Sequence, residues 1–255
     1  MARARLPTTD IGTHIDAIEE HGRALGVAAD KSGADAEVPS CPTWTVRALL
    51  GHLGMVHRWA ATFVREGRAA TADGRRPTLA TAPADGLLDW YLDGHAALVA
   101  ALRAAPPDLD CWTFLPAPSP LAFWARRQAH ETAIHRADVE GAAGSVPDYP
   151  TDFADDGLGE LIGGFMARRG GTLYADPVRT LLVAPTDTGS RWHVTIGPDD
   201  RQVSTDGAPA DCTLRGRAAD LYLLLWNREP VRPPEVSGDP AVLEIWHELA
   251  TINWR

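Results

Sequence analysis

The first two thirds of the chain carry apolar residues that recur every three or four positions, in stretches separated by glycine and proline. This spacing places apolar side chains along one face of a helix. It predicts helices over residues 11–29, 46–65, 85–105, 121–140 and 151–169. Thr45 stands where the second of these helices needs an N-cap. The first four amphipathic helices are typical of a four-helix bundle.

The pattern changes after Gly170. Short apolar runs predict strands over residues 180–184, 191–196, 202–205 and 211–215, with a Gly-Pro-Asp-Asp turn at 197–200. Two further helices are expected over residues 218–227 and 240–252. The chain is therefore expected to be α+β, with a helical domain over residues 1–170 and a small α+β domain over residues 171–255.

Charge and composition exclude several classes of partner. The net charge of −10 argues against nucleic acid or an anionic membrane surface as the main partner. The most apolar stretch, residues 221–226, is too short to span a bilayer, and no apolar run follows the N-terminal arginines as in a signal peptide. The cysteines are far apart, so neither a disulfide framework nor a thiolate zinc site is expected. We expect a cytoplasmic protein, monomeric or a small homo-oligomer.

The segment His130-Glu131-Thr132-Ala133-Ile134-His135 is the main candidate for chemistry. A zinc-protease motif needs two histidines four positions apart, whereas His130 and His135 are five apart and point about 140° away from each other. Glu131 and His135, however, are four apart and share a helix face. A carboxylate beside an imidazole suits zinc, iron, nickel or manganese.

A catalytic metal commonly has three protein ligands and one open position, so a third ligand must come from another helix. His52 is the best candidate because it lies in the apolar run Leu49-Leu50-Gly51-His52-Leu53. His57, five residues later, should face elsewhere.

Simpler interpretations stay open at this point. Glu131 and His135 could be an ordinary surface pair of a helix, and His52 could be a hydrogen-bonded core residue. Arg136 and Asp138 could be surface charges or groups that orient His135. Basic pairs such as Arg126-Arg127 are expected on solvated helix faces. Five further histidines, His14, His21, His57, His95 and His130, are expected to be structural or exposed.

Two long segments and several shorter ones resemble segments of the mycothiol-dependent maleylpyruvate isomerase family. They follow the same order as in the family and extend over nearly the whole chain. The segments are SCPTWTVRALLGHL at 40–53, VHRW at 56–59, RQAHETAIHRAD at 127–138, WHV at 192–194, GRAADL at 216–221, LLWNR at 224–228 and VSGD at 236–239. The resemblance implies a DinB-like metal-binding bundle followed by a small α+β domain similar to sterol carrier proteins.

The family resemblance also implies roles for individual residues. His52, Glu131 and His135 match the family's metal ligands, and zinc is the metal we expect. Mycothiol or a similar thiol would be the cosubstrate of an isomerase or S-transferase that acts on a small electrophilic molecule. Arg228 stands where the family commonly has an arginine after Leu-Leu-Trp, with Asn227 in place of the more usual glycine. Arg228 or Arg136 would hold an anionic substrate.

Two other classes of function stay open from the sequence. Bound water could replace the thiol as the nucleophile, which would make the protein a metal-dependent hydrolase of a small molecule. The chain could also be a non-catalytic protein that binds a metal or ligand and keeps the same fold.

Overall fold

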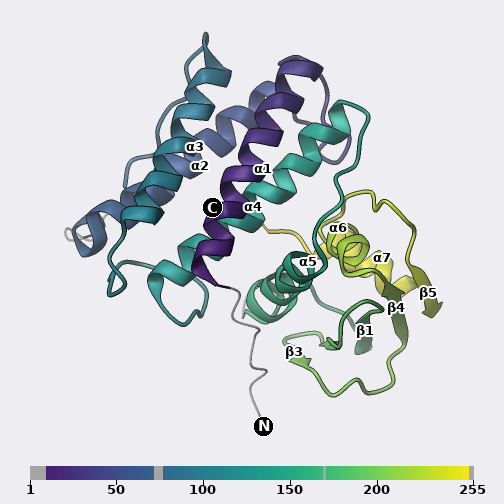
Figure 1. Ribbon diagram of the computed structural model, residues 1–255. Coiled ribbons are helices and arrows are strands. Elements are labelled where there is room, and N and C mark those ends of the chain that lie inside the picture. Colours follow the sequence, from purple (N-terminus) through teal and green to yellow (C-terminus); the bar gives the residue numbers. More distant parts are fainter. Residues whose placement is uncertain (1–9, 72–76, 169–170, 253–255) are drawn as a thin grey trace. The chain divides into compact units, whose positions relative to one another are not determined.

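The computed structural model describes residues 10–71, 77–168 and 171–252. Contacts within the chain divide it into two compact units, Thr9–Pro147 and Asp148–Arg255. Helices form the first unit, and a sheet with helices forms the second (Figure 1). The expected α+β class with an N-terminal helical bundle is confirmed. Within the described ranges, no helix is both long and apolar enough to cross a membrane.

Four helices build the N-terminal unit: α1 (Ile11–Ser32), α2 (Val46–Glu66), α3 (Leu87–Ala104) and α4 (Pro120–Ala142). α1 and α2 each pack against both α3 and α4 (Figure 1). The Thr45 hydroxyl accepts a hydrogen bond from the Ala48 amide, as an N-cap of α2 should. A short 3₁₀ turn, η1 (Gly67–Thr71), follows α2.

The core of the bundle consists of the apolar stripes that the sequence shows. Leu25, Leu49, Leu53 and Tyr91 are fully buried and belong to one cluster. α4 differs from its neighbours because it is buried on most of its surface and carries charged and polar side chains inward. A buried charge is unfavourable unless it is paired, so these side chains need partners within the bundle.

The connection between α1 and α2, residues 33–45, is a tightly bonded loop that we call the α1–α2 loop. The Val38 amide donates to the Trp44 carbonyl at 3.0 Å, and the Cys41 amide donates to the Val38 carbonyl at 2.9 Å. The Val46 amide at the start of α2 donates to the Ala36 carbonyl at 2.9 Å. Because the Val38 side chain is also fully buried, the loop is anchored to the bundle at its middle and at its end.

The C-terminal unit contains one mixed sheet and its helices. The strands have the order β3-β2-β1-β4-β5, with β1 and β4 parallel and the other pairs antiparallel. The elements are α5 (Thr151–Leu158), η2 (Gly159–Met166), β1 (Arg179–Pro185), β2 (Trp192–Ile196), β3 (Arg201–Ser204), β4 (Cys212–Gly216), α6 (Ala218–Leu225), β5 (Glu235–Gly238) and α7 (Ala241–Leu249).

Alternate residues of the central strands form the buried face of this sheet. Leu181, Val194 and Leu214 are fully buried, and so are Tyr222 of α6 and Trp246 of α7. α6 packs against β1 and β4, and α7 packs against β1. This alternation is the two-residue period of a strand with one buried face. β5 was not predicted, because its four residues are all exposed and show no such alternation.

The division between the units differs from the boundary expected at residue 170. The Tyr149 and Phe153 rings lie 5.6 Å and 6.3 Å from the ring of Tyr222 in α6, so α5 packs with the C-terminal unit. The expected helix over 151–169 is also split, since residues after Leu158 form the π-helical segment η2. Helical periodicity indicates that a helix has an apolar face, but it does not indicate which core receives that face.

Candidate metal centre

The three predicted ligands come together between α2 and α4. The Nε2 atom of His52 lies 3.5 Å from Oε1 of Glu131, and Nε2 of His135 lies 3.3 Å from the same oxygen. One donor atom from each residue lies within 4.8 Å of the other two. Glu131 and His135 meet because they are one helical turn apart on α4, and His52 reaches them from α2.

This group of donors lies at the edge of the bundle interior. The side chains of His52 and His135 are 19% and 14% exposed, and that of Glu131 is 8% exposed. The group is therefore not a simple surface pair, which was one interpretation of Glu131 and His135. Two imidazoles and one carboxylate that are still reachable from solvent suit a divalent metal with an open position.

Asp138 fixes the orientation of His135. The Nδ1–H group of His135 donates to Oδ2 of Asp138 at 2.8 Å, and Asp138 has no exposed surface. With its proton on Nδ1, a neutral His135 presents the lone pair of Nε2 toward Glu131 and His52. Of the two interpretations given above for Asp138, the structure supports the orienting group and not the surface charge.

The prediction for Arg127 was wrong. This residue was expected on a solvated face, but it is 1% exposed and its Nη2 atom lies 3.2 Å from Oε2 of Glu131. Its position four residues before Glu131 was the available signal. Glu131 therefore directs one oxygen toward Arg127 and the other toward the two histidines.

The charges of the site shift the acid–base properties of Glu131 and His135. Burial disfavours the Glu131 carboxylate, but hydrogen bonds from His135 and His52 and the charges of His135 and Arg127 hold its pKa well below the usual range. Burial likewise disfavours a charged His135, yet its bonds to Asp138 and Glu131 outweigh burial and raise its pKa to about 9. At neutral pH a metal must therefore displace a proton from His135.

The α1–α2 loop contributes two contacts to the same region. The Trp44 ring lies edge-on to His52, with ring centroids 5.1 Å apart and planes at 72°. The Ser40 hydroxyl donates to Oδ1 of Asp138 at 2.5 Å. Neither Ser40 nor Trp44 was predicted to belong to the site, although both lie in the segment that carries the family resemblance.

The two arginines expected to bind substrate have other contacts in the structure. Nε of Arg136 lies 2.6 Å from Oε1 of Glu140, and Nη1 of Arg136 lies 3.1 Å from Nδ1 of His21 in α1. Arg228 belongs to the C-terminal unit, where its guanidinium donates to the Trp226 carbonyl. A role in substrate binding stays a prediction for both residues.

The five remaining histidines of the bundle are buried. They are His14, His21, His57, His95 and His130. Nε2 of His57 lies 3.0 Å from Oγ1 of Thr132, whose hydroxyl donates to the Gln128 carbonyl, so Nε2 of His57 must be the donor. Nε2 of His95 lies 2.9 Å from the Ile18 carbonyl. These contacts tie helices together and support the structural role that was one of the two expectations.

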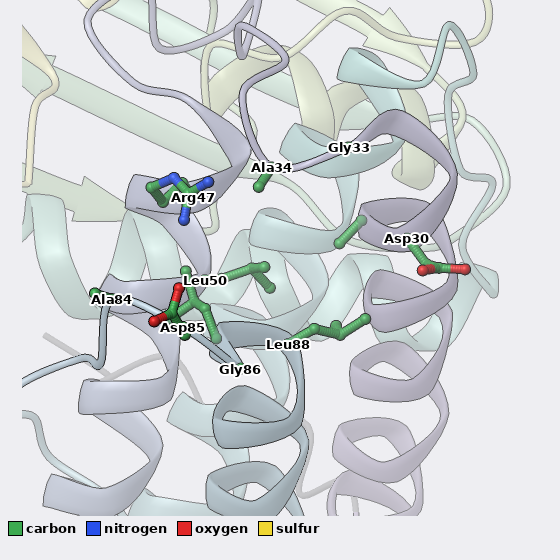
Figure 2. Close-up of a pocket in the computed structure, with 11 residues that line it drawn as sticks. Asp30, Gly33, Ala34, Arg47, Leu50, Ala84, Asp85, Gly86 and Leu88 are labelled. Carbon is green, nitrogen blue, oxygen red and sulfur yellow. The ribbon is translucent and has the colours of Figure 1, made fainter.

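A hollow of about 300 Å³ lies elsewhere on the bundle, between the end of α1, the start of α2 and the start of α3 (Figure 2). Arg47, Leu50 and Asp85 are among its lining residues, and Asp30 lies at the end of α1. His52, Glu131 and His135 do not line it. The hollow is therefore a different place from the candidate metal centre.

Comparisons with known proteins agree on one family. Residues 15–140 match the family model of the mycothiol maleylpyruvate isomerase N-terminal domain, and residues 152–244 match that described as the MDMPI C-terminal domain. Two similar solved structures are the mycothiol-dependent maleylpyruvate isomerase, at 13% identity, and its H52A mutant in that protein's own numbering, at 12%. Each has a TM-score of 0.60 and covers 90% of this chain and 93% of the other. No protein with a curated function matches significantly.

Proposed function

Because the chain belongs to the mycothiol-dependent maleylpyruvate isomerase family, we propose that it is a metal-dependent enzyme that uses mycothiol or a similar small thiol to act on a small electrophile. His52, Glu131 and His135 would hold the metal, with zinc as the ion we expect. The observation that carries this proposal is the convergence of both Nε2 atoms on one Glu131 oxygen at a place that solvent can reach.

The donor set fits such an ion. Two neutral imidazoles and one carboxylate are a common catalytic zinc set, and Asp138 provides the outer hydrogen bond that metal-binding histidines usually have. When bound, a divalent metal would lower the pKa of a coordinated thiol and so supply thiolate at neutral pH. Arg127 would hold the second oxygen of Glu131, leaving the first for the metal.

The nucleophilic thiol is expected to come from the cosubstrate. Cys111 and Cys212 are buried, and burial raises the pKa of both thiols, so they stay protonated and out of reach at neutral pH. Cys41 is half-buried in the α1–α2 loop. A Cys41→Ser variant should therefore keep thiol-dependent turnover.

The proposed reaction begins with attack of the thiolate sulfur on one carbon of a conjugated cis double bond. The alkene electron pair moves onto the conjugated carbonyl, and the former double bond can then rotate. Expulsion of the thiolate restores the double bond in the trans geometry, so an isomerase leaves the thiol unchanged. In an S-transferase the carbon–sulfur bond would persist, and the enolate would take up a proton from solvent at carbon.

Arg228 is the first candidate for the residue that binds an anionic substrate. A guanidinium can bind a carboxylate through two parallel hydrogen bonds. Arg228 comes first because it stands where the family commonly has an arginine after Leu-Leu-Trp, whereas Arg136 pairs with Glu140 and contacts His21. Arg228→Lys should raise KM for an anionic substrate more than it lowers kcat, whereas Arg136→Lys should change KM little.

Metal content and thiol dependence together test the proposed function. We expect about one equivalent of zinc in the wild-type protein, and loss of the metal in His52→Ala and His135→Ala. His193→Ala, in β2 of the other unit, is the matched control and should keep the metal. Turnover should then be measured with maleylpyruvate, with and without mycothiol.

Each outcome of these assays decides between the candidate functions. Turnover that needs both metal and thiol supports the proposal, and product analysis separates isomerisation from thiol transfer. Metal-dependent hydrolysis without thiol would show a hydrolase instead. A wild-type protein that takes up no zinc even when zinc is added would rule out the proposed metal centre.

A further inference from the structure

We propose that Asp138, held in place by Ser40 of the α1–α2 loop, is a positioning residue that sets the metal affinity of the centre. This inference rests on the proposed function, because it assumes that His52, Glu131 and His135 bind the metal. Asp138 would not touch the metal or the substrate. It would act through His135, by fixing which nitrogen carries the proton and where the imidazole points.

The contacts of Asp138 account for both of its carboxylate oxygens. Oδ2 accepts the hydrogen bond from Nδ1 of His135 at 2.8 Å, and Oδ1 accepts the hydrogen bond from the Ser40 hydroxyl at 2.5 Å. The residue has no exposed surface, so solvent cannot replace either partner. A carboxylate in this position keeps the Nδ1 proton on His135 and makes Nε2 a better electron-pair donor.

Ser40 gives Asp138 a fixed position relative to α2. The loop that carries Ser40 is held by backbone bonds between Val38 and Trp44 and by the burial of Val38. The same loop places Trp44 against the ring of His52. One rigid loop therefore contacts His52 directly and His135 through Asp138, although the two histidines belong to different helices.

The burial of this group argues for a role beyond folding. A fully buried carboxylate is unfavourable unless well partnered, and an apolar residue at the same place would avoid that cost. The adjacent pair Arg136–Glu140 on α4 is the contrasting case, in which both side chains are partly exposed and pair with each other. Glu140→Gln is therefore a matched control for Asp138→Asn.

The test measures zinc affinity by competition with a chromophoric chelator, using the full-length protein. We expect Asp138→Asn to bind zinc about 10–100-fold more weakly than wild type. Ser40→Ala should weaken zinc binding by a smaller factor. Ser40→Thr, which keeps the hydroxyl, should bind zinc with an affinity close to that of the wild type. Glu140→Gln should bind zinc like wild type.

The visible spectrum of the cobalt-loaded protein separates positioning from a purely structural role. Cobalt absorption reports the arrangement of the ligands, so its band should shift or lose intensity in Asp138→Asn but not in Glu140→Gln. Thermal unfolding of the metal-free variants shows whether each one folds. Unchanged zinc affinity and an unchanged cobalt band in a folded Asp138→Asn protein would overturn this inference while leaving the proposed metal centre intact. Failure of the wild-type protein to bind zinc would overturn both.

Discussion

Asn227 shows how a single residue can serve two purposes. It follows α6 with a φ of 61°, in the left-handed region that favours glycine. Its amide donates to the Leu224 carbonyl and the Arg228 amide donates to the Leu223 carbonyl, which together close the helix as a Schellman motif. The Asn227 side chain also bonds to His247 of α7 through both its oxygen and its nitrogen. A glycine at this position would allow the same backbone conformation but would lack the side-chain bonds to His247.

Substitutions of Asn227 should therefore be ranked by these two contributions. Asn227→Gly removes the bonds to α7 but not the favourable backbone, and should cost about 1 kcal/mol of unfolding free energy. Asn227→Ala removes the bonds and adds left-handed strain, for a total of about 2–3 kcal/mol. Urea unfolding of the three proteins checks the order. An alanine variant more stable than the glycine variant would contradict it.

Some residues of the candidate site could be predicted from the sequence, and others could not. Glu131 and His135 could be paired from their spacing on one helix, and His52 from its place on an apolar stripe together with the family resemblance. Ser40 could not be connected to Asp138 in this way, because 98 positions separate them and only the folded α1–α2 loop brings them together. Arg127 was misplaced because its neighbour Arg126 made the pair look like a solvated surface.

Helix packing in the bundle depends on glycines at points of close approach. A Cβ atom added at Gly54 of α2 would lie 2.4 Å from the Trp90 ring of α3. A Cβ added at Gly141 of α4 would meet no atom within 4 Å outside its own helix and chain neighbours. Both glycines lie within helices, where alanine is intrinsically the more favourable residue. They differ in surroundings, because a Cβ atom is blocked at Gly54 and has free space at Gly141.

The two alanine substitutions should therefore have opposite signs. Gly54→Ala forces the large Trp90 ring to move and should destabilise the protein by about 1–3 kcal/mol, despite the better helix propensity of alanine. Gly141→Ala should stabilise it by about 0.5 kcal/mol. Denaturant unfolding of both variants beside wild type measures this difference. Equal effects at the two sites would show that propensity and not packing decides.

Most elements of the chain were predictable because their apolar residues follow a clear period. The strand β5 was not predictable, because its residues are all exposed and it has no buried face. The break at Leu158 was not predictable either, because Gly163-Gly164 are not a recognisable signal for a π-helical turn. The same limit applies to the α5 helix. Its periodicity was correct, but its partner Tyr222 lies far along the chain.

At the scale of the whole molecule, buried histidines should make stability depend on pH. Burial, with the nearby charge of Arg136 and the nearby His130, lowers the pKa of His21 to about 3. Above about pH 6.5 this histidine is neutral in both the folded and the unfolded chain. Below that value the unfolded chain takes up a proton that the folded chain does not, so stability falls until the pH approaches 3.

A His21→Gln variant isolates this contribution. Between pH 6 and pH 5, the unfolding free energy of the wild type should fall by about 1 kcal/mol more than that of the variant. Urea unfolding at the two pH values gives both differences. Parallel pH profiles would mean that His21 is protonated in the folded protein as well.

All three predicted ligands belong to the Thr9–Pro147 unit, and none comes from the unit that begins at Asp148. In evolutionary terms, the proposed metal centre would place the two units under separate constraints. Mutation, insertion or replacement in the C-terminal unit would leave the proposed ligand set complete, so natural selection could reshape that unit for new substrates while the proposed centre was retained. The reverse does not hold, because substitution of His52 on α2, or of Glu131 or His135 on α4, removes a ligand.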